Sequence, residues 1–405
     1  MFVIDTYTII IVSVLLVMAL LTPFINPFFR KPKLSAATYT AEEETIEEEE
    51  SEAIKAEEVA ENKIVDEKKC TPISIVFTPN NDAESLARNL EAFLTQDYAD
   101  YQIIVVAPKG DSETEDILKR FSSNTRLYTT FIPESSKYMS RKKLAITLGV
   151  KAAKHNWVMI CDIFCAPQSK DWLAALAQNC TAENNLVGGF TQYDEFASDF
   201  WRFERFHTDC YLMREVQKGT AYRWNGNALL FRKDEFLNAE GFRGNLKYVR
   251  GEFDFIVNKY ARKGSMRIEN TPEATLIEET PIKKHWLNHH LFYMENRQHL
   301  QRSWAHRAWF NVDQWAMHLN YLMIVGAITY GVLTQNWIIT AAAALSLVIT
   351  LALRISMGKK ALNSFDIDVP AWKIIPLEMR LIWQNLSYKI RYWRADKYDF
   401  ISHKL

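Results

Sequence analysis

Between residues 72 and 167 the chain alternates short apolar runs with segments that carry apolar residues at helical spacing. The apolar runs are ISIVFT (73–78), YQIIVV (101–106) and RLYTTFI (126–132), and the helix-like segments that follow them cover 82–94, 112–121 and 140–154. A fourth apolar run begins at Trp157 and ends just before Asp162. Such alternation predicts an α/β fold, in which a mostly parallel sheet has helices on both faces. Ligands are expected at the carboxyl edge of the sheet.

Two long stretches without charged residues predict membrane spans. No charged residue occurs from 6 to 29, and no Asp, Glu, Lys or Arg occurs from 314 to 353. As one helix the second stretch would be roughly 60 Å long, about twice the hydrocarbon thickness, so two helices that meet near 334–336 explain it better. A cleaved signal peptide fits the first stretch poorly, because basic residues follow the apolar run. Three transmembrane helices are therefore predicted.

Basic residues flank the three predicted spans on one side. They are Arg30, Lys31 and Lys33 after the first span, Arg302 and Arg307 before the second, and Arg354, Lys359 and Lys360 after the third. The positive-inside rule places these clusters in the cytoplasm and the N-terminus outside. The five cysteines form no CxxC pair and are typical of reduced thiols. The main domain is therefore expected in the cytoplasm.

The net charge of −1 conceals a strongly acidic segment. Between residues 42 and 67 thirteen acids stand against two lysines, so this segment carries −11 and the rest of the chain +10. Such a run is typical of a solvated linker, and a docking site for a basic protein partner is the alternative. The positive charge of the rest of the chain favours binding to an anionic membrane surface and to phosphate-bearing ligands. No nucleic-acid partner is expected.

These patterns divide the chain into six predicted parts. They are an N-terminal transmembrane anchor (1–33), an acidic linker (34–70), an α/β domain (71–282), amphipathic interfacial helices (283–313), two transmembrane helices (314–354) and a basic cytoplasmic tail (355–405). The interfacial helices are predicted because several aromatic residues lie among arginines there.

Three segments of the middle region carry a further signal. They are ISIVFTPNNDAESLARNLEAFLTQDYADYQIIVV from 73, RKKLAITLGVKAAKHNWVMICDIFCAP from 141, and a stretch from FERFHTDCYL through WNGNALLFRKDEFLNAEGF to RGEFDFIVN (203–258). Together they resemble the family 2 glycosyltransferases, inverting enzymes with the Rossmann-like GT-A fold, in their membrane-anchored bacterial branch. The resemblance implies that a sugar passes from a nucleotide sugar to a lipid-linked or cell-envelope glycan acceptor at the inner (cytoplasmic) membrane.

The resemblance implies a metal site at the end of the fourth apolar run. Asp162 matches the first acid of the DxD motif, which in the family holds Mg²⁺ or Mn²⁺ against the diphosphate. Phe164 stands in the place of the second acid. Because phenylalanine offers no lone pair, Mg²⁺ or Mn²⁺ binding is expected to be weakened.

The resemblance also implies acids that contact the nucleotide after the second strand. Here Ala and Pro stand at 107–108, so Asp82 and Asp111 are the candidates to substitute for them. Asp111 fits equally the cap of the next helix. Lys142 or Lys143 would neutralise phosphate, and a solvated helix face is the alternative for both. Lys143 is taken as the nucleotide-binding candidate.

The catalytic base of the family opens a helix near the acceptor, and RGEFDFIVN (250–258) occupies that place. Phe253 aligns with the usual aspartate, so Glu252 and Asp254 are the candidate bases. Both acids also suit a helix N-terminus without any catalytic role.

Candidate acceptor-binding residues follow from the same resemblance. Asn225 and Asn227 lie in a turn before a strand, where amides would bind sugar hydroxyls, although a tight turn that needs Gly is the alternative. Gln298, Arg302 and Trp304 supply the residue types of the family's Q-x-x-R-W element in looser spacing.

Two functions stay open from the sequence. The first is an active membrane-anchored transferase. The second is a catalytically inactive homologue that serves as a scaffold or partner-binding membrane subunit. The second is favoured by three altered acidic positions, at 107–108, Phe164 and Phe253, because fold and function are separable.

Overall fold

A seven-stranded sheet forms the centre of the computed structural model, which describes residues 5–29, 71–132 and 140–401. The strand order is β3-β2-β1-β4-β8-β6-β9. The strands are β1 (Ile73–Phe77), β2 (Tyr101–Pro108), β3 (Leu127–Ile132), β4 (Trp157–Cys161), β6 (Leu186–Gly189), β8 (Ala228–Arg232) and β9 (Met266–Glu269). Only β8 runs against its neighbours, β4 and β6. The predicted mostly parallel α/β sheet is confirmed.

Helices cover both faces of this sheet. The helices α2 (Ala83–Leu94), α3 (Ser112–Arg120) and α5 (Trp172–Ala177) pack on one face, and α4 (Arg141–Ala152), α6 (Asp199–Gln217), α7 (Lys233–Asn238) and α8 (Glu252–Tyr260) on the other. Successive strand residues point to opposite faces. In β1, Ile75 therefore packs in the core on the side of α2, α3 and α5, and Val76 packs in the core on the side of α4, α6, α7 and α8. Both faces are apolar, as expected for buried parallel strands.

A small second sheet lies beside the carboxyl edge of β4. It contains β5 (Cys165–Pro167), β10 (Leu276–Glu278) and β7 (Thr191–Tyr193), with β10 in the middle. β10 pairs antiparallel with β5 and parallel with β7. Because β5 follows Asp162 closely in the chain, this sheet carries Glu278 to the region where the large sheet ends.

The helix α4 packs closely on the large sheet at Gly149. A Cβ atom built there would lie 2.3 Å from Val76 Cγ1 and 3.3 Å from Val106 Cγ2. We expect Gly149→Ala to lower the free energy of unfolding by about 1–3 kcal/mol, because overpacking outweighs the helix propensity of alanine. The melting temperature in detergent measures this change. Gly326→Ala is the matched control, since no atom lies within 4 Å of its Cβ position; an equal effect of both substitutions would contradict the prediction.

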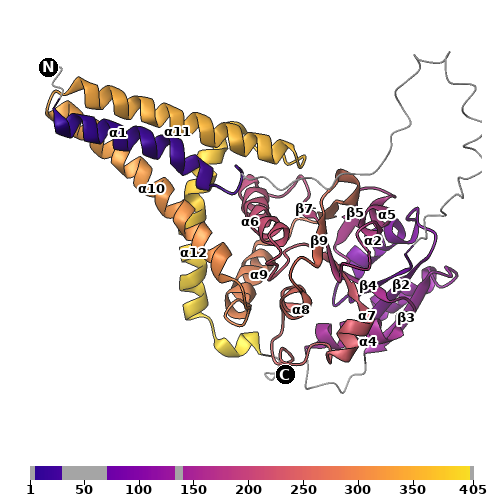
Figure 1. Ribbon diagram of the computed structural model, residues 1–405. Helices are drawn as coiled ribbons and strands as arrows, with labels where there is room; N and C mark the ends of the chain where they lie inside the picture. Colours follow the sequence, from indigo (N-terminus) through magenta and orange to yellow (C-terminus); the bar gives the residue numbers. More distant parts are fainter. Residues whose placement is uncertain (1–4, 30–70, 133–139, 402–405) are drawn as a thin grey trace, which may run out of the picture.

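Among the residues that the structure describes, three helices are long and apolar enough to cross a membrane. They are α1 (Thr6–Leu21), which continues as the short helix η1 (Thr22–Ile25), α10 (Trp304–Leu333) and α11 (Trp337–Asn363). The break between the last two falls at 334–336, as the sequence indicates. The three helices form a bundle that projects from the α/β domain (Figure 1).

The segment after α11, which was predicted as a basic cytoplasmic tail, is helical and packs against the rest of the chain. Residues 355–401 form the end of α11, η3 (Ala371–Lys373), α12 (Ile374–Arg394) and η4 (Lys397–Phe400). The helix α12 packs against α6, α11 and α9 (Lys283–Asn296), and it lies between the bundle and the domain (Figure 1). One face of α12 is apolar and buried, with Leu381 and Tyr388 in the core. The acidic linker lies outside the described residues.

A buried ion cluster joins the bundle to α12. Arg354 of α11 lies 3.3 Å from Asp313 of α10 and 3.2 Å from Glu378 of α12. All three side chains are at most 1% exposed. Arg354 also donates to the carbonyl of Thr22, and Asn26 donates to Glu378. The basic residue that the sequence assigns to a cytoplasmic flank is therefore the centre of a structural contact between four segments.

Candidate functional site

Two predicted acids emerge at the same edge of the large sheet. The neighbouring strands β1 and β4 are parallel, with Phe77 beside Cys161, so the loop that holds Asp82 and the end of β4 at Asp162 lie close together. Burial raises the pKa of Asp82, and the negative charge of Asp162 raises it further. We call Asp82, Lys142, Asp162 and Glu252 the strand-edge cluster.

Lys142 is the electrostatic centre of the strand-edge cluster. Its Nζ lies 2.6 Å from Asp162 Oδ1, and the two side chains are 19% and 12% exposed. Burial opposes the charge of Lys142, but the carboxylates of Asp162 and Glu252 hold its pKa above the usual value. Its positive charge also acts on Asp82. Three predicted acids from distant parts of the chain thus interact with one ammonium group.

Glu252 reaches this cluster from the first turn of α8. The residue before it, Gly251, has φ +95°, and a Cβ there would lie 2.2 Å from Asn296 Nδ2. Glycine is therefore required at 251 for α8 to start in this direction. Glu252 is buried, and its Oε1 has no hydrogen-bond partner in the described part of the chain. An acid with a free buried oxygen is available to accept a proton.

The residues at this edge do not fit a hard divalent cation. Mg²⁺ and Mn²⁺ need several oxygen ligands, yet Asp162 Oδ1 is engaged by Lys142 and Phe164 has no lone pair. Over residues 5–29, 71–132 and 140–401, no group of three His, Cys, Asp or Glu side chains could hold a metal. We therefore derive no step through a metal ion.

Two predicted nucleotide contacts have other partners. Lys143 is fully buried, and its ammonium donates to the carbonyls of Asn245 and Tyr248. Desolvation lowers its pKa to about 8. Asp111 caps α3 by accepting from the amide and hydroxyl of Thr114, at 3.2 and 2.7 Å. The structure thus brings neither residue into the strand-edge cluster, and Lys142 occupies the place expected for Lys143.

A second polar cluster, the acceptor-side network, lies between α6, the turn before β8 and α8. It consists of Arg205, Asp209, Arg223, Asn225, Asn227, Asp254 and Glu278. Arg223 Nε donates to Asp254 at 3.0 Å, and its guanidinium also donates to the side chain of Asn225. Asn225 in turn donates to Asp209 at 3.1 Å. Both acids, Asp209 and Asp254, are buried, and burial raises their pKa.

The acceptor-side network contacts the strand-edge cluster through the turn before β8. The amide of Asp162 donates to the carbonyl of Asn227 at 3.1 Å. The side chain of Asn227 donates to Glu278, which forms an ion pair with Arg205. Of the predicted pair Asn225 and Asn227, it is Asn227 that connects the two clusters. Asp254, in contrast, is held by Arg223.

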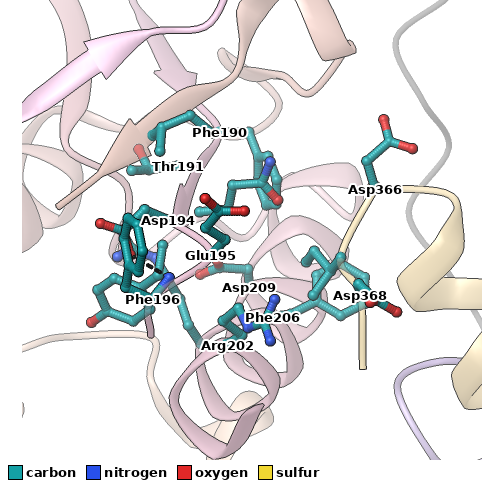
Figure 2. A pocket seen from close by; sticks show the side chains of 15 residues that line it. Phe190, Thr191, Asp194, Glu195, Phe196, Arg202, Phe206, Asp209, Asp366 and Asp368 are labelled. Atoms are coloured by element: carbon teal, nitrogen blue, oxygen red, sulfur yellow. Dashed lines mark hydrogen bonds between the residues drawn. The ribbon is translucent and has the colours of Figure 1, made fainter. Parts of the chain in front are cut away.

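A cavity of about 430 Å³ lies beside this network, and Arg205 and Asp209 of the network line it (Figure 2). Asp194, Glu195 and Phe196 line it from the loop after β7, and Arg202, Arg205 and Asp209 from α6. Asp366 and Asp368, from the segment after α11, close the opposite side. The cavity therefore lies between the α/β domain and the segment that follows α11.

The buried acid Asp209 makes stability depend on pH. Burial raises the pKa of Asp209 to about 7, so the folded chain holds this proton more tightly than the unfolded chain, where the pKa is about 4. The stability it contributes is complete below about pH 4 and is lost as pH rises towards 7, by about 1.4 kcal/mol per pH unit. We expect Asp209→Asn, which keeps an acceptor for Asn225, to melt higher than wild type at pH 8 and equally at pH 4. Parallel melting curves across this range would contradict the assignment.

The remaining predicted acceptor residues lie apart from both clusters. Gln298 donates to the hydroxyl of Tyr392 on α12, and Arg302 to the carbonyl of Asn258 at 2.6 Å. Trp304 begins α10 and is 79% exposed. These contacts join the segment between α9 and α10 to α12 and to α8.

The buried charges of α6 were not predicted from the sequence. Arg205 and Asp209 are spaced i, i+4 in a helix with many aromatic residues, and both are buried. Charged residues one turn apart inside an apolar segment are a signal for a buried polar network, because isolated buried charges are costly.

A family profile matches most of the chain. The sequence profile of glycosyl transferase family 21 matches residues 52–357. Among solved structures, the mannosyltransferase PcManGT from Pyrobaculum calidifontis, in complex with GDP-Man and Mn²⁺, is 15% identical, with a TM-score of 0.47 over 74% of this chain and 89% of that chain. S. aureus TarS 1-349 with UDP-GlcNAc is 12% identical, with a TM-score of 0.39 over 78% and 81%. The search of curated proteins gave no match.

Proposed function

Since the chain belongs to glycosyl transferase family 21, we propose that it transfers a sugar, with inversion, from a nucleotide sugar to a lipid-linked or cell-envelope acceptor. The family confirms the glycosyltransferase class that the sequence predicted, although the resemblance was to family 2. The observation that carries the proposal is the convergence of Asp82, Asp162 and Glu252 on Lys142 at the carboxyl edge of the sheet. Open α/β sheets bind nucleotides at this edge.

Each cluster has a part in the proposed transfer. The strand-edge cluster, which includes Asp82, binds the nucleotide diphosphate. Glu252 accepts the proton of the attacking hydroxyl, because its Oε1 is buried and unpartnered in the described structure. The amides of Asn225 and Asn227 orient the acceptor. Arg223 fixes both Asn225 and Asp254 through hydrogen bonds, so Asp254 is a positioning residue.

The cavity beside the acceptor-side network suits a polar acceptor that approaches from the membrane. Its wall includes Asp366 and Asp368, which follow the third predicted span by a few residues. Carboxylates and arginines bind hydroxyl groups well. We therefore place the sugar or headgroup of the acceptor in this cavity.

The helix α12 supports a position of the domain on the membrane surface. Exposed apolar residues follow one stripe of η3 and α12, at Trp372, Met379, Trp383, Leu386, Ile390 and Trp393. Basic residues accompany them, at Arg380, Lys389, Arg391 and Arg394. This composition is typical of a helix that lies in the interface of an anionic membrane. The domain is then cytoplasmic and the N-terminus outside, as the basic flanks predict.

A transfer assay tests the proposed function. The full chain in lipid nanodiscs that contain bacterial lipid extract is incubated with radiolabelled uridine, guanosine and cytidine diphosphate sugars, each with EDTA or Mn²⁺. We expect one donor to label the lipid-extractable or glycan fraction. Neither transfer nor hydrolysis of any donor under either condition would overturn the enzymatic function.

A non-catalytic homologue is the second candidate, and one observation favours it. Ala107 is fully buried at the end of β2 and Phe253 packs against the core, so both residues that stand where the resemblance to family 2 implies acids serve packing. In that case the protein binds a partner without turnover. A nucleotide that binds but is neither transferred nor hydrolysed would support this candidate.

A further inference from the structure

The strand-edge cluster holds a fixed cation at the place where the predicted motif would hold a metal. Lys142 Nζ donates a hydrogen bond to Asp162 Oδ1 at 2.6 Å. Phe164 stands at the position of the second acid of the DxD motif. We propose that Lys142 takes the part of the divalent cation, so that its ammonium binds the diphosphate of the donor directly and no metal is needed. This inference rests on the proposed function, because it concerns the same site.

Geometry leaves Lys142 free to bind phosphate. An ammonium group has three donors, and the contact with Asp162 uses one of them. The side chain of Lys142 is 19% exposed, whereas the neighbouring Lys143 is fully buried and donates to two carbonyls. Of the two lysines, only Lys142 is therefore open to a ligand.

The surroundings of Lys142 favour a permanent positive charge. Its Nζ lies 5.7 Å from the centroid of the Phe253 ring, which is within the range of a cation–π contact. The carboxylates of Asp162 and Glu252 also stabilise the ammonium. Phe253, an apparent loss in an acidic motif, thus contributes to a lysine-based site.

Arg250 supplies a second positive charge at the same place. It is exposed at the end of the segment before α8, and its charge acts on both Asp82 and Lys142. Lys142 and Arg250 together carry the formal charge of one divalent cation. A diphosphate between them would be neutralised in the way that a metal ion neutralises it.

Equilibrium titration with UDP, GDP and CDP tests the inference. The full chain in nanodiscs is titrated calorimetrically in EDTA and again in Mn²⁺. We expect one nucleotide to bind with the same Kd, within about twofold, in both conditions. Lys142→Met should weaken binding by about 10–100-fold, because a charged hydrogen bond is lost. Lys151→Met, on the exposed face of the same helix, is the control and should leave the Kd unchanged.

Asp162→Asn separates the two mechanisms by the sign of its effect. If Lys142 binds the diphosphate, the substitution releases the ammonium from its carboxylate and tightens binding in EDTA by about tenfold. If a metal binds the diphosphate, the same substitution weakens binding. The double variant Lys142→Met/Asp162→Asn removes the pair without leaving a buried charge, and it should bind as weakly as Lys142→Met.

The outcomes distinguish this inference from the proposed function. Binding that appears only with Mn²⁺, or an Asp162→Asn variant that binds more weakly, overturns the lysine-based site and leaves a nucleotide-sugar site in place. Binding of none of the three nucleotides in either condition overturns both. Equal binding in EDTA, lost in Lys142→Met and tightened in Asp162→Asn, supports the inference.

Discussion

Replacing Arg354 by methionine is expected to prevent a stable assembly of the membrane bundle with the α/β domain. The substitution leaves Asp313 and Glu378 without their cation, and both are at most 1% exposed. Removing one partner of a buried ion pair costs about 3–5 kcal/mol, because the charge that remains is desolvated and uncompensated. Most proteins have only 5–15 kcal/mol of stability. We expect a large fall in melting temperature and in the monodisperse fraction in detergent.

Two variants control for this prediction. Lys360→Met removes an exposed cation from the same helix, and it should leave the melting temperature within a few degrees of wild type. The triple variant Arg354→Met/Asp313→Asn/Glu378→Gln removes the charges together, and it should recover most of the lost stability, since uncharged replacements of buried ion pairs are often tolerated. A triple variant as unstable as Arg354→Met would show that charge imbalance is not the cause.

Replacing Glu252 by glutamine is expected to abolish most of the transfer activity. If Glu252 is the general base, its loss lowers kcat by about 10²–10⁴-fold. Nucleotide binding should be retained, because Lys142 keeps its contact with Asp162. The rate of sugar transfer in nanodiscs, measured at saturating donor, checks the prediction.

Asp254→Asn is the matched carboxylate-to-amide substitution. Asp254 is bound by Arg223, so we expect it to lower the melting temperature and to reduce kcat less than Glu252→Gln does. The reverse order, with Asp254→Asn inactive and Glu252→Gln active, would assign the base to Asp254.

Local patterns predicted the elements that form the site. Apolar runs and helical spacing indicated β1 to β4 and the helices between them, because each pattern depends on neighbours in sequence. Asp162 was placed at the edge of the sheet since a buried strand ends just before it. Glu252 and Asp254 were placed at a helix start, which the structure also has at α8.

Contacts across long sequence distances were beyond the same reasoning. Lys142 rather than Lys143 meets Asp162 because of the rotation of α4, and a one-residue difference on a helix changes direction by about 100°. Arg354 looked like part of a basic flank, since its partner Asp313 lies 41 residues away. The packing of α12 was not predicted, because basic residues are interspersed with the apolar residues of its two faces. One of these faces is buried and the other is exposed.

A structure of the full chain with UDP or GDP bound, determined in EDTA, tests the central claim most directly. The account predicts the diphosphate at the carboxyl edge of β1 and β4, with a phosphate oxygen within hydrogen-bonding distance of Lys142 Nζ and Glu252 facing the side where the sugar would lie. A nucleotide bound away from this edge would contradict the account.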